Sequence, residues 1–363
     1  MRGFGNSLIG LIMTASAVMS CLFVVSRPME AEPEVLQQKP LRARLIFAGD
    51  LMQHLPQVQA ARSGNSFDYS KSFAAVAPYF EQSDLACINL ETTLTPTAPY
   101  TGYPCFRSPT ALATALKYMG IDVAVLANNH CCDGGTAGVE HTISALTANG
   151  ISHTGVFADQ ADYAKNNILY LQRGGIRFAL VNYTYGTNGI PIPKGRIVHL
   201  IDTLHIAADL ARIPKDSADC IIACVHWGVE YQRKENADQR ALAAFLHRKG
   251  VDLIIGSHPH VVQPFEADGR SVTIYSLGNF VSNQRKRYSD GGLMVSIVAT
   301  KELDGQMDYT VDLIPVWVSL PGYFVVTPES ADSLSRESRI RYDQFVSDTE
   351  QTLFAADSYF SKQ

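Results

Sequence analysis

Six short, almost continuously apolar runs, each ending in polar residues, constrain this chain more than any other feature of its sequence. They lie between residues 43 and 280 and end in these clusters: Gly49-Asp50, Asn89-Leu90-Glu91, Asn128-Asn129-His130, His226-Trp227-Gly228 with Glu230, His258-Pro259-His260 and Gly278-Asn279. Continuous apolar runs of this length are typical of strands that are buried on both faces. Because the carboxyl ends of parallel strands meet at one edge of a sheet, we expect the clusters to lie together there, where α/β proteins bind ligands.

Helices are expected between these strands. Apolar spacing and end signals predict them at about residues 70–82, 109–119, 135–149, 202–213 and 236–249. Residues 167–184 and 292–318 instead show the pattern of two β-hairpins. Strands that alternate with helices favour an α/β fold in which helices cover a mixed sheet. Residues 43–325 are expected to form one domain, followed by a polar helical tail at residues 326–363.

Charge and cysteine usage narrow the functional classes. The 363 residues carry a formal net charge of −5 and contain no run of lysine and arginine, so nucleic acid is not an expected partner. The seven cysteines are irregularly spaced, which argues against a disulfide-stapled scaffold. Cys131 and Cys132 directly follow His130. They could form a disulfide with each other or contact a soft metal, but simple packing of the two side chains is favoured.

The amino-terminal segment differs from the rest of the chain. Residues 1–27 carry Arg2 and then no charge until Arg27, which indicates an export signal or a single membrane anchor. The uncharged run is long enough to span a bilayer, which takes about 20 apolar residues. Its "AVMSC" ending resembles a lipoprotein cleavage box, so a lipid on Cys21 and an uncleaved helix both remain open. Residues 28–42 read as a polar linker, and the protein is expected at the bacterial cell envelope.

Six of the cluster residues form a mixed set of oxygen and imidazole ligands: Asp50, Glu91, Asn129, His226, His258 and His260. Zn, Mn, Fe and Mg accept such ligands, and one carboxylate can bridge two ions about 3.5–4 Å apart. Residues two apart in an extended segment point the same way, so His258 and His260 would present both rings to one site. Each residue also has an ordinary explanation, for example Asp50 as a cap, Glu91 in an ion pair and His226 as a core histidine. Their joint position at strand ends favours a metal or anion site.

The motifs, taken in order, resemble a known family. "FAGDLM", "DLACINLETTLT", "LANNHCCDGG", "VHWGVEY", "GSHPHVVQPFE" and "SLGNFV" are similar to those of the CapA family of poly-γ-glutamate capsule biosynthesis proteins. The resemblance covers roughly residues 43–300. Members of this family look like relatives of the calcineurin-type metallophosphoesterases. The resemblance therefore implies a four-layer αββα sandwich, in which helices flank two packed sheets.

The resemblance also implies roles for single residues. It places metal ligands, for two divalent ions of Mn, Zn, Fe or Mg, at Asp50, Glu91, Asn129, His226, His258 and His260. Glu91 stands where a bridging carboxylate is expected, and His130 matches the general acid that protonates a leaving oxygen or nitrogen. Met52 stands where the wider superfamily has a histidine, so the first ion is expected to bind weakly or to be Mg or Mn. Contacts with substrate or with the ligands are expected from Asn89, Arg107, Glu230 and Asn279.

The function that the resemblance implies is the biosynthesis or processing of an anionic polymer such as poly-γ-glutamate, within a membrane synthesis complex. A metal-dependent hydrolase or transferase is the expected enzyme type, since the metal would polarise a carbonyl. Two alternatives stay open. One is a metal-dependent phosphoesterase or related hydrolase with another substrate, and the other is a polymer-binding envelope component without catalytic activity. A shared fold does not decide among them.

Overall fold

The computed structural model describes residues 39–354. The expected export segment at residues 1–27, most of the expected linker and the end of the expected tail lie outside the described residues. In the described part of the chain, no helix combines the length and the apolar character needed to cross a membrane.

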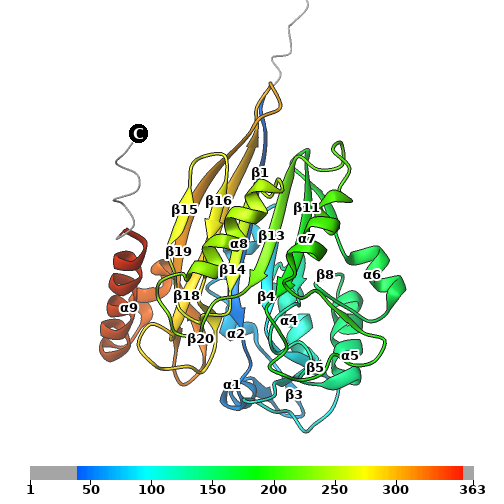
Figure 1. Ribbon diagram of the computed structural model, residues 1–363. Helices are drawn as coiled ribbons and strands as arrows, with labels where there is room; N and C mark the ends of the chain where they lie inside the picture. The colour runs from blue at the N-terminus through cyan, green and yellow to red at the C-terminus, as the bar shows by residue number, and fades with distance from the viewer. Residues whose placement is uncertain (1–38, 355–363) are drawn as a thin grey trace, which may run out of the picture. The chain divides into compact units, whose positions relative to one another are not determined.

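Two sheets form the centre of the fold (Figure 1). The eight-stranded sheet has the order β20 (Phe324–Val326), β19 (Met307–Ser319), β18 (Gly291–Lys301), β1 (Leu41–Leu51), β4 (Leu85–Leu90), β7 (Val123–Val125) and β8 (Ser152–Thr154), with β17 (Asn279–Val281) also beside β1. The six-stranded sheet has the order β10 (Leu169–Arg173), β11 (Ile176–Thr184), β13 (Cys220–His226), β14 (Leu253–Ser257), β16 (Val272–Ile274) and β15 (Phe265–Ala267). Within them β1, β4, β7 and β8 run parallel, as do β11, β13, β14 and β16.

The helices and the smaller strand pairs complete the described elements. The helices are α1 (Leu55–Ala60), α2 (Ser70–Phe73), α3 (Ala77–Glu81), α4 (Ala111–Met119), α5 (Gly135–Ala148), α6 (Gln160–Asn166), α7 (Thr203–Ala211), α8 (Ala237–Arg248), α9 (Arg336–Phe354) and the 3-10 helix η1 (Pro328–Ser333). The small pairs are β2 (Arg62–Ser63) with β3 (Ser66–Phe67), β5 (Thr93–Thr95) with β6 (Arg107–Pro109), and β9 (Val156–Phe157) with β12 (Ile197–Val198).

Alternate side chains of β1 show how the layers stack. Leu45 and Phe47 point into the core between the two sheets, whereas Ile46 and Ala48 point into a second core that α3, α4 and α5 cover. A third core lies between the six-stranded sheet and helices α7 and α8 (Figure 1). The four layers are therefore helix, sheet, sheet and helix, and the expected αββα sandwich is confirmed. Full burial of a side chain such as Phe47 contributes about 1.5–3 kcal/mol.

The observed elements follow the expected ones, with two informative differences. The helix expected at residues 70–82 is broken into α2 and α3, because Pro78 lacks an amide proton and its ring obstructs the preceding turn. The helix expected from residue 109 starts at Ala111, because Arg107–Pro109 pair with β5 as strand β6. The helices expected near 135–149, 202–213 and 236–249 are α5, α7 and α8, and both hairpins are present as β10–β11 and β18–β19.

Candidate functional site

The polar clusters meet where the carboxyl ends of strands from both sheets come together. Asp50 lies near the end of β1, and Glu91 directly follows β4. His226 ends β13 of the other sheet and pairs with Ser257 at the end of β14. The expectation of a single sheet edge is corrected, because two edges contribute. This follows from the sandwich, in which the parallel strands of each sheet end on the same side.

Asp50 organises one side of the cluster. Its Oδ1 accepts a hydrogen bond from Asn89 Nδ2 at 2.8 Å, and its Oδ2 lies 3.0 Å from His260 Nδ1. The main-chain amide of His258 donates to the same carboxylate at 3.3 Å. All four residues are buried, so these contacts are made away from water. Asn89 therefore holds the Asp50 carboxylate in position.

Glu91 has the least satisfied side chain of the cluster. It is fully buried, and in the part of the chain that the structure describes neither carboxylate oxygen has a hydrogen-bond partner. Its Oε1 lies 3.8 Å from both His226 Nε2 and His260 Nε2. Burial, followed by the nearby charge of Asp50, raises the pKa of Glu91 well above its ordinary value. A buried carboxylate without donors requires a proton or a cation.

The donor set around Glu91 suits a divalent metal. Ligating atoms of Asp50, Glu91 and His260 lie within 4.8 Å of one another, and all three residues are buried. His258 Nδ1 is also buried, and no hydrogen-bond partner for it occurs within residues 39–354. Two carboxylates and two imidazoles form a donor set that Zn, Mn and Fe share, so the residues present fit such an ion.

His226 and Asn129 face each other across the two sheets. His226 Nε2 lies 2.8 Å from Asn129 Oδ1, and His226 Nδ1 lies 2.9 Å from Ser257 Oγ. Burial, and then the neighbouring histidines, lowers the pKa of His226 well below its ordinary value, so the ring is neutral at pH 7. The Ser257 hydroxyl can hold the Nδ1 side of the ring, which leaves Nε2 facing the Asn129 oxygen and 3.8 Å from Glu91 Oε1.

The His258-Pro259-His260 segment is a turn rather than an extended strand end. His258 has φ of 98° and His260 has φ of 58°, which is the left-handed region that L side chains rarely adopt. The expectation that the two rings share one direction because the segment is extended is therefore wrong. In this turn the centroids of the two imidazole rings are still only 6.0 Å apart. Burial lowers the pKa of His258 to about 3. Left-handed backbone at two histidines is strain of the kind that clusters at functional sites.

His130 is held by an acidic partner that the sequence analysis missed. Its Nδ1 lies 2.7 Å from Asp133 Oδ2, and the same oxygen accepts a hydrogen bond from the amide of Phe106 at 2.6 Å. The Phe106 ring packs edge-on against the imidazole, with ring centroids 4.6 Å apart. The only sequence signal is an aspartate three residues after a histidine, which is too common to be distinctive.

Of the remaining predicted residues, Asn279 contacts the histidine turn, whereas Arg107 and Glu230 do not. Asn279 Nδ2 donates to the main-chain oxygens of His260 at 3.4 Å and of Ser289 at 2.8 Å, so it supports the histidine turn. Arg107 is half-buried in β6 and, among the described residues, its guanidinium makes no hydrogen bond or ion pair. Glu230 is exposed and lies outside the buried cluster.

Asn128, which opens the Asn-Asn-His motif, holds the motif in place. Its Nδ2 donates to Asn89 Oδ1 at 3.2 Å and to the main-chain oxygen of Leu90 at 2.9 Å. Its Oδ1 accepts a hydrogen bond from the amide of His130 at 3.1 Å. Asn128 thus joins two strand ends and leaves Asn129 free to face His226.

Glycine allows the strands to approach closely at the site. A Cβ on Gly49 would lie 2.1 Å from the main-chain oxygen of Gly278, and a Cβ on Gly256 would lie 2.1 Å from that of Tyr275. Both contacts are with backbone, so any side chain would force the strands apart. Close packing of the strands therefore requires glycine at position 49, directly before Asp50 in the first motif.

This protein is thus a four-layer α/β sandwich that carries buried carboxylates and imidazoles at the ends of its strands. Residues 44–284 match the family model for the bacterial capsule synthesis protein PGA_cap. The chain belongs to this family, which confirms the resemblance seen in its motifs.

Two named relatives support this assignment. The chain is 30% identical over 267 residues to the capsule biosynthesis protein CapA of Bacillus anthracis, covering 70% of this chain and 63% of that protein. It is 28% identical over 301 residues to the PGA biosynthesis protein CapA of Bacillus subtilis (strain 168), covering 81% of this chain and 76% of that protein. The chain thus spans less than two thirds of the Bacillus anthracis relative. Among solved structures, a phosphatase from Mycoplasma pneumoniae aligns with a TM-score of 0.49 at 12% identity, over 83% of this chain and 100% of that one.

Proposed function

We propose that this protein is exported to the cell envelope and acts in the biosynthesis or processing of a capsule polymer such as poly-γ-glutamate, through a divalent-metal site. The observation that carries the proposal is Glu91, a fully buried carboxylate with no donor among the described residues and two imidazoles at 3.8 Å. Such a group requires a proton or a cation, and the carboxylate and imidazoles around it are ligands of a divalent metal.

The metal centre would be held by the residues already named. The proposed ligands are Asp50, Glu91, Asn129, His226, His258 and His260, for two ions of Mn, Zn, Fe or Mg. Bound metal would supply a Lewis acid for a carbonyl or phosphoryl oxygen and a more acidic water. Asn89 and Asn128 hold the ligands in position through hydrogen bonds to Asp50 and between strand ends.

His130 is the residue that we propose to move a proton. Asp133 occupies Nδ1 at 2.7 Å, so Nε2 is the ring nitrogen left to donate to a leaving oxygen or nitrogen. The carboxylate would stabilise the imidazolium in the protonated state and fix the ring against Phe106. This arrangement suits hydrolysis or transfer at an amide and is equally suited to a phosphoester.

An anionic polymer suits the side chains beside the cluster. Lys286 Nζ lies 4.5 Å from the centre of the Tyr231 ring, and that ring lies 6.2 Å from the ring of His260. Lys286 thus lies against an aromatic ring that neighbours His260, and half-buried Arg107 offers a second cation in β6, next to Phe106. Capsule polymers of glutamate carry one carboxylate per residue, which cations of this kind bind. The names of the two Bacillus relatives refer to capsule and PGA biosynthesis.

The location and the partners rest on the sequence. Residues 1–27 read as an export signal or anchor, with a lipid on Cys21 or an uncleaved helix holding the protein at the envelope. A membrane synthesis complex for the polymer is the partner that we propose there. Fractionation of cells, with and without a Cys21→Ala substitution, separates the two forms of anchoring.

The test of the proposed function is a turnover assay on the purified full chain. With Mn²⁺ present, we expect γ-linked glutamate polymer to shorten and new amino groups to form. His130→Ala should abolish this turnover and leave the metal content unchanged. His141→Ala, a histidine of α5 away from the cluster, is the matched control and should retain activity.

Other outcomes of the assay favour the alternatives. Turnover of an aryl phosphate, with the polymer left intact, would assign a phosphoesterase. Polymer binding by a metal-free protein, without turnover, would assign a binding component of the envelope. Loss of metal in His130→Ala would contradict the proton-transfer role.

A further inference from the structure

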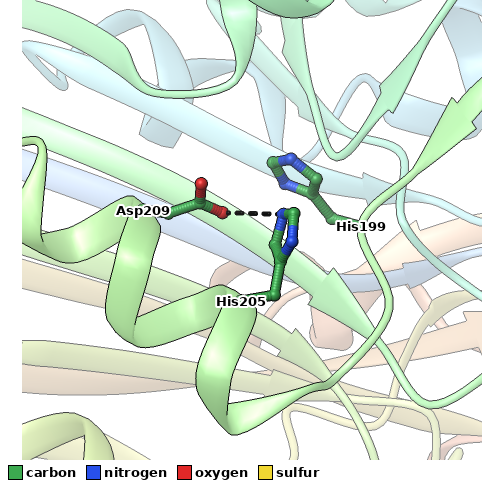
Figure 2. A group of neighbouring side chains, drawn as sticks. All are labelled: His199, His205 and Asp209. Carbon is green, nitrogen blue, oxygen red and sulfur yellow. Dashed lines mark ion pairs between the residues drawn. The ribbon is translucent and has the colours of Figure 1, made fainter.

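A second cluster of metal-ligating side chains lies in the outer helical layer. His199 is in the segment between β12 and α7, and His205 and Asp209 project from successive turns of α7 (Figure 2). Figure 2 shows the three side chains directed toward one another, and their ligating atoms lie within 4.8 Å of one another. The cluster uses none of the residues at the strand ends.

His199 is the unusual member of this cluster. It is 1% exposed, and neither of its ring nitrogens has a hydrogen-bond partner within the described residues. Its ring stacks on Tyr183 with centroids 5.2 Å apart, and Phe157 closes another side at 4.9 Å. A buried polar group without a partner costs about 1–3 kcal/mol. Burial lowers the pKa of His199 to about 4, so a neutral ring with a free lone pair is present at pH 7.

His205 and Asp209 already have the spacing of two metal ligands. His205 Nε2 lies 3.3 Å from Asp209 Oδ2. Two ligand atoms of a tetrahedral zinc shell, with bonds of about 2.0–2.2 Å, are about 3.3–3.5 Å apart. The Tyr183 hydroxyl donates to the same oxygen at 3.1 Å, as hydrogen bonds behind a ligating carboxylate commonly do. Arg212 lies 3.4 Å from the other oxygen, Oδ1, and leaves Oδ2 to the cluster.

We propose that His199, His205 and Asp209 form a second metal site, which binds one divalent ion of the zinc type. Three protein ligands leave a fourth position for water, and His205, with half of its side chain exposed, opens the site to solvent. A bound ion would satisfy His199 and tie the segment before α7 to the helix. This proposal does not depend on the proposed function, because it concerns different residues in a different layer.

The test compares the Zn²⁺ content of full-chain variants after equilibrium dialysis. His205→Ala should hold one equivalent less than Leu204→Ala, a matched control on the same helix that is 82% exposed. The difference between these two variants does not depend on how much metal the strand-end cluster binds. Neither substitution removes a buried side chain, so both variants should fold.

Two further measurements decide the outcome. Co²⁺ added to Leu204→Ala should give the visible absorption of a tetrahedral site, and His205→Ala should lack that component. Asp209→Asn, which can keep its hydrogen bond from Tyr183, should lose the same equivalent of Zn²⁺. Equal metal content in His205→Ala and Leu204→Ala would overturn the proposal and leave an ordinary helical ion pair beside a core histidine.

Discussion

Replacing Glu91 by glutamine should affect the metal-free and the metal-bound protein in opposite directions. In the metal-free protein, burial and the charge of Asp50 raise the pKa of the Glu91 carboxyl well above 4.5. The folded state therefore holds a proton that the unfolded chain releases, and stability falls as the pH rises above about 4.5. Glu91→Gln removes this loss because glutamine does not ionise.

The size of the effect follows from the pH of the assay. An assay at about pH 7.5 is about three pH units above the ordinary pKa of 4.5, and each unit lowers the free energy of unfolding by at most about 1.4 kcal/mol. The ceiling on stabilisation by Glu91→Gln in metal-free protein is therefore about 4 kcal/mol, and the gain should vanish near pH 4.5. In the presence of metal at about 100 times its dissociation constant, the parent gains about 2.7 kcal/mol, which the variant should lack.

Urea unfolding in EDTA and in saturating Mn²⁺ measures both effects. Glu81→Gln, an exposed glutamate at the end of α3, is the control and should change little in either condition. Glu91→Gln should be more stable than the parent in EDTA, and Mn²⁺ should stabilise only the parent. The reasoning would be refuted if the variant were destabilised in EDTA, or if Mn²⁺ stabilised both proteins equally.

Two further predictions concern packing and pH. Gly49→Ala would place a Cβ 2.1 Å from a backbone oxygen, so it should lower the free energy of unfolding by about 1–3 kcal/mol and weaken Mn²⁺ binding in calorimetry. Gly186→Ala is the control and should have neither effect, because the space around Gly186 is open. Burial raises the pKa of Asp252 to about 6, so its carboxyl lowers stability as the pH rises from about 4 to 6. Asp252→Asn should therefore gain about 1–3 kcal/mol over the parent between pH 4 and pH 7 in urea unfolding, and a constant difference would contradict this sign.

The strands and the polar clusters could be predicted because they depend on local pattern. A continuous apolar run can satisfy burial on both faces only as a central strand, and its end is where polar residues can begin. How the strands divide between two sheets could not be read in the same way. That division depends on pairing over long sequence separations, as between Asp50 of β1 and Asn279 of β17.

The finer geometry of the candidate site needed the structure for similar reasons. The left-handed turn at His258 and His260 is stabilised by the surrounding fold, since neither residue favours that backbone region by itself. Asp133 and Ser257 act through single hydrogen bonds that leave no pattern in the sequence. The cluster around His199 was missed because its members lie in a loop and on a helix, away from any strand end.

The most direct measurement is anomalous X-ray scattering from crystals of the full chain grown with Mn²⁺. The account predicts anomalous peaks for two ions at bonding distance from the Glu91 carboxylate, with the imidazoles of His226 and His260 among their ligands, and the loss of these peaks in His258→Ala/His260→Ala. An ordered Glu91 that contacts only water or protein atoms, with no peak beside it at saturating Mn²⁺, would contradict the metal centre on which the proposed function rests.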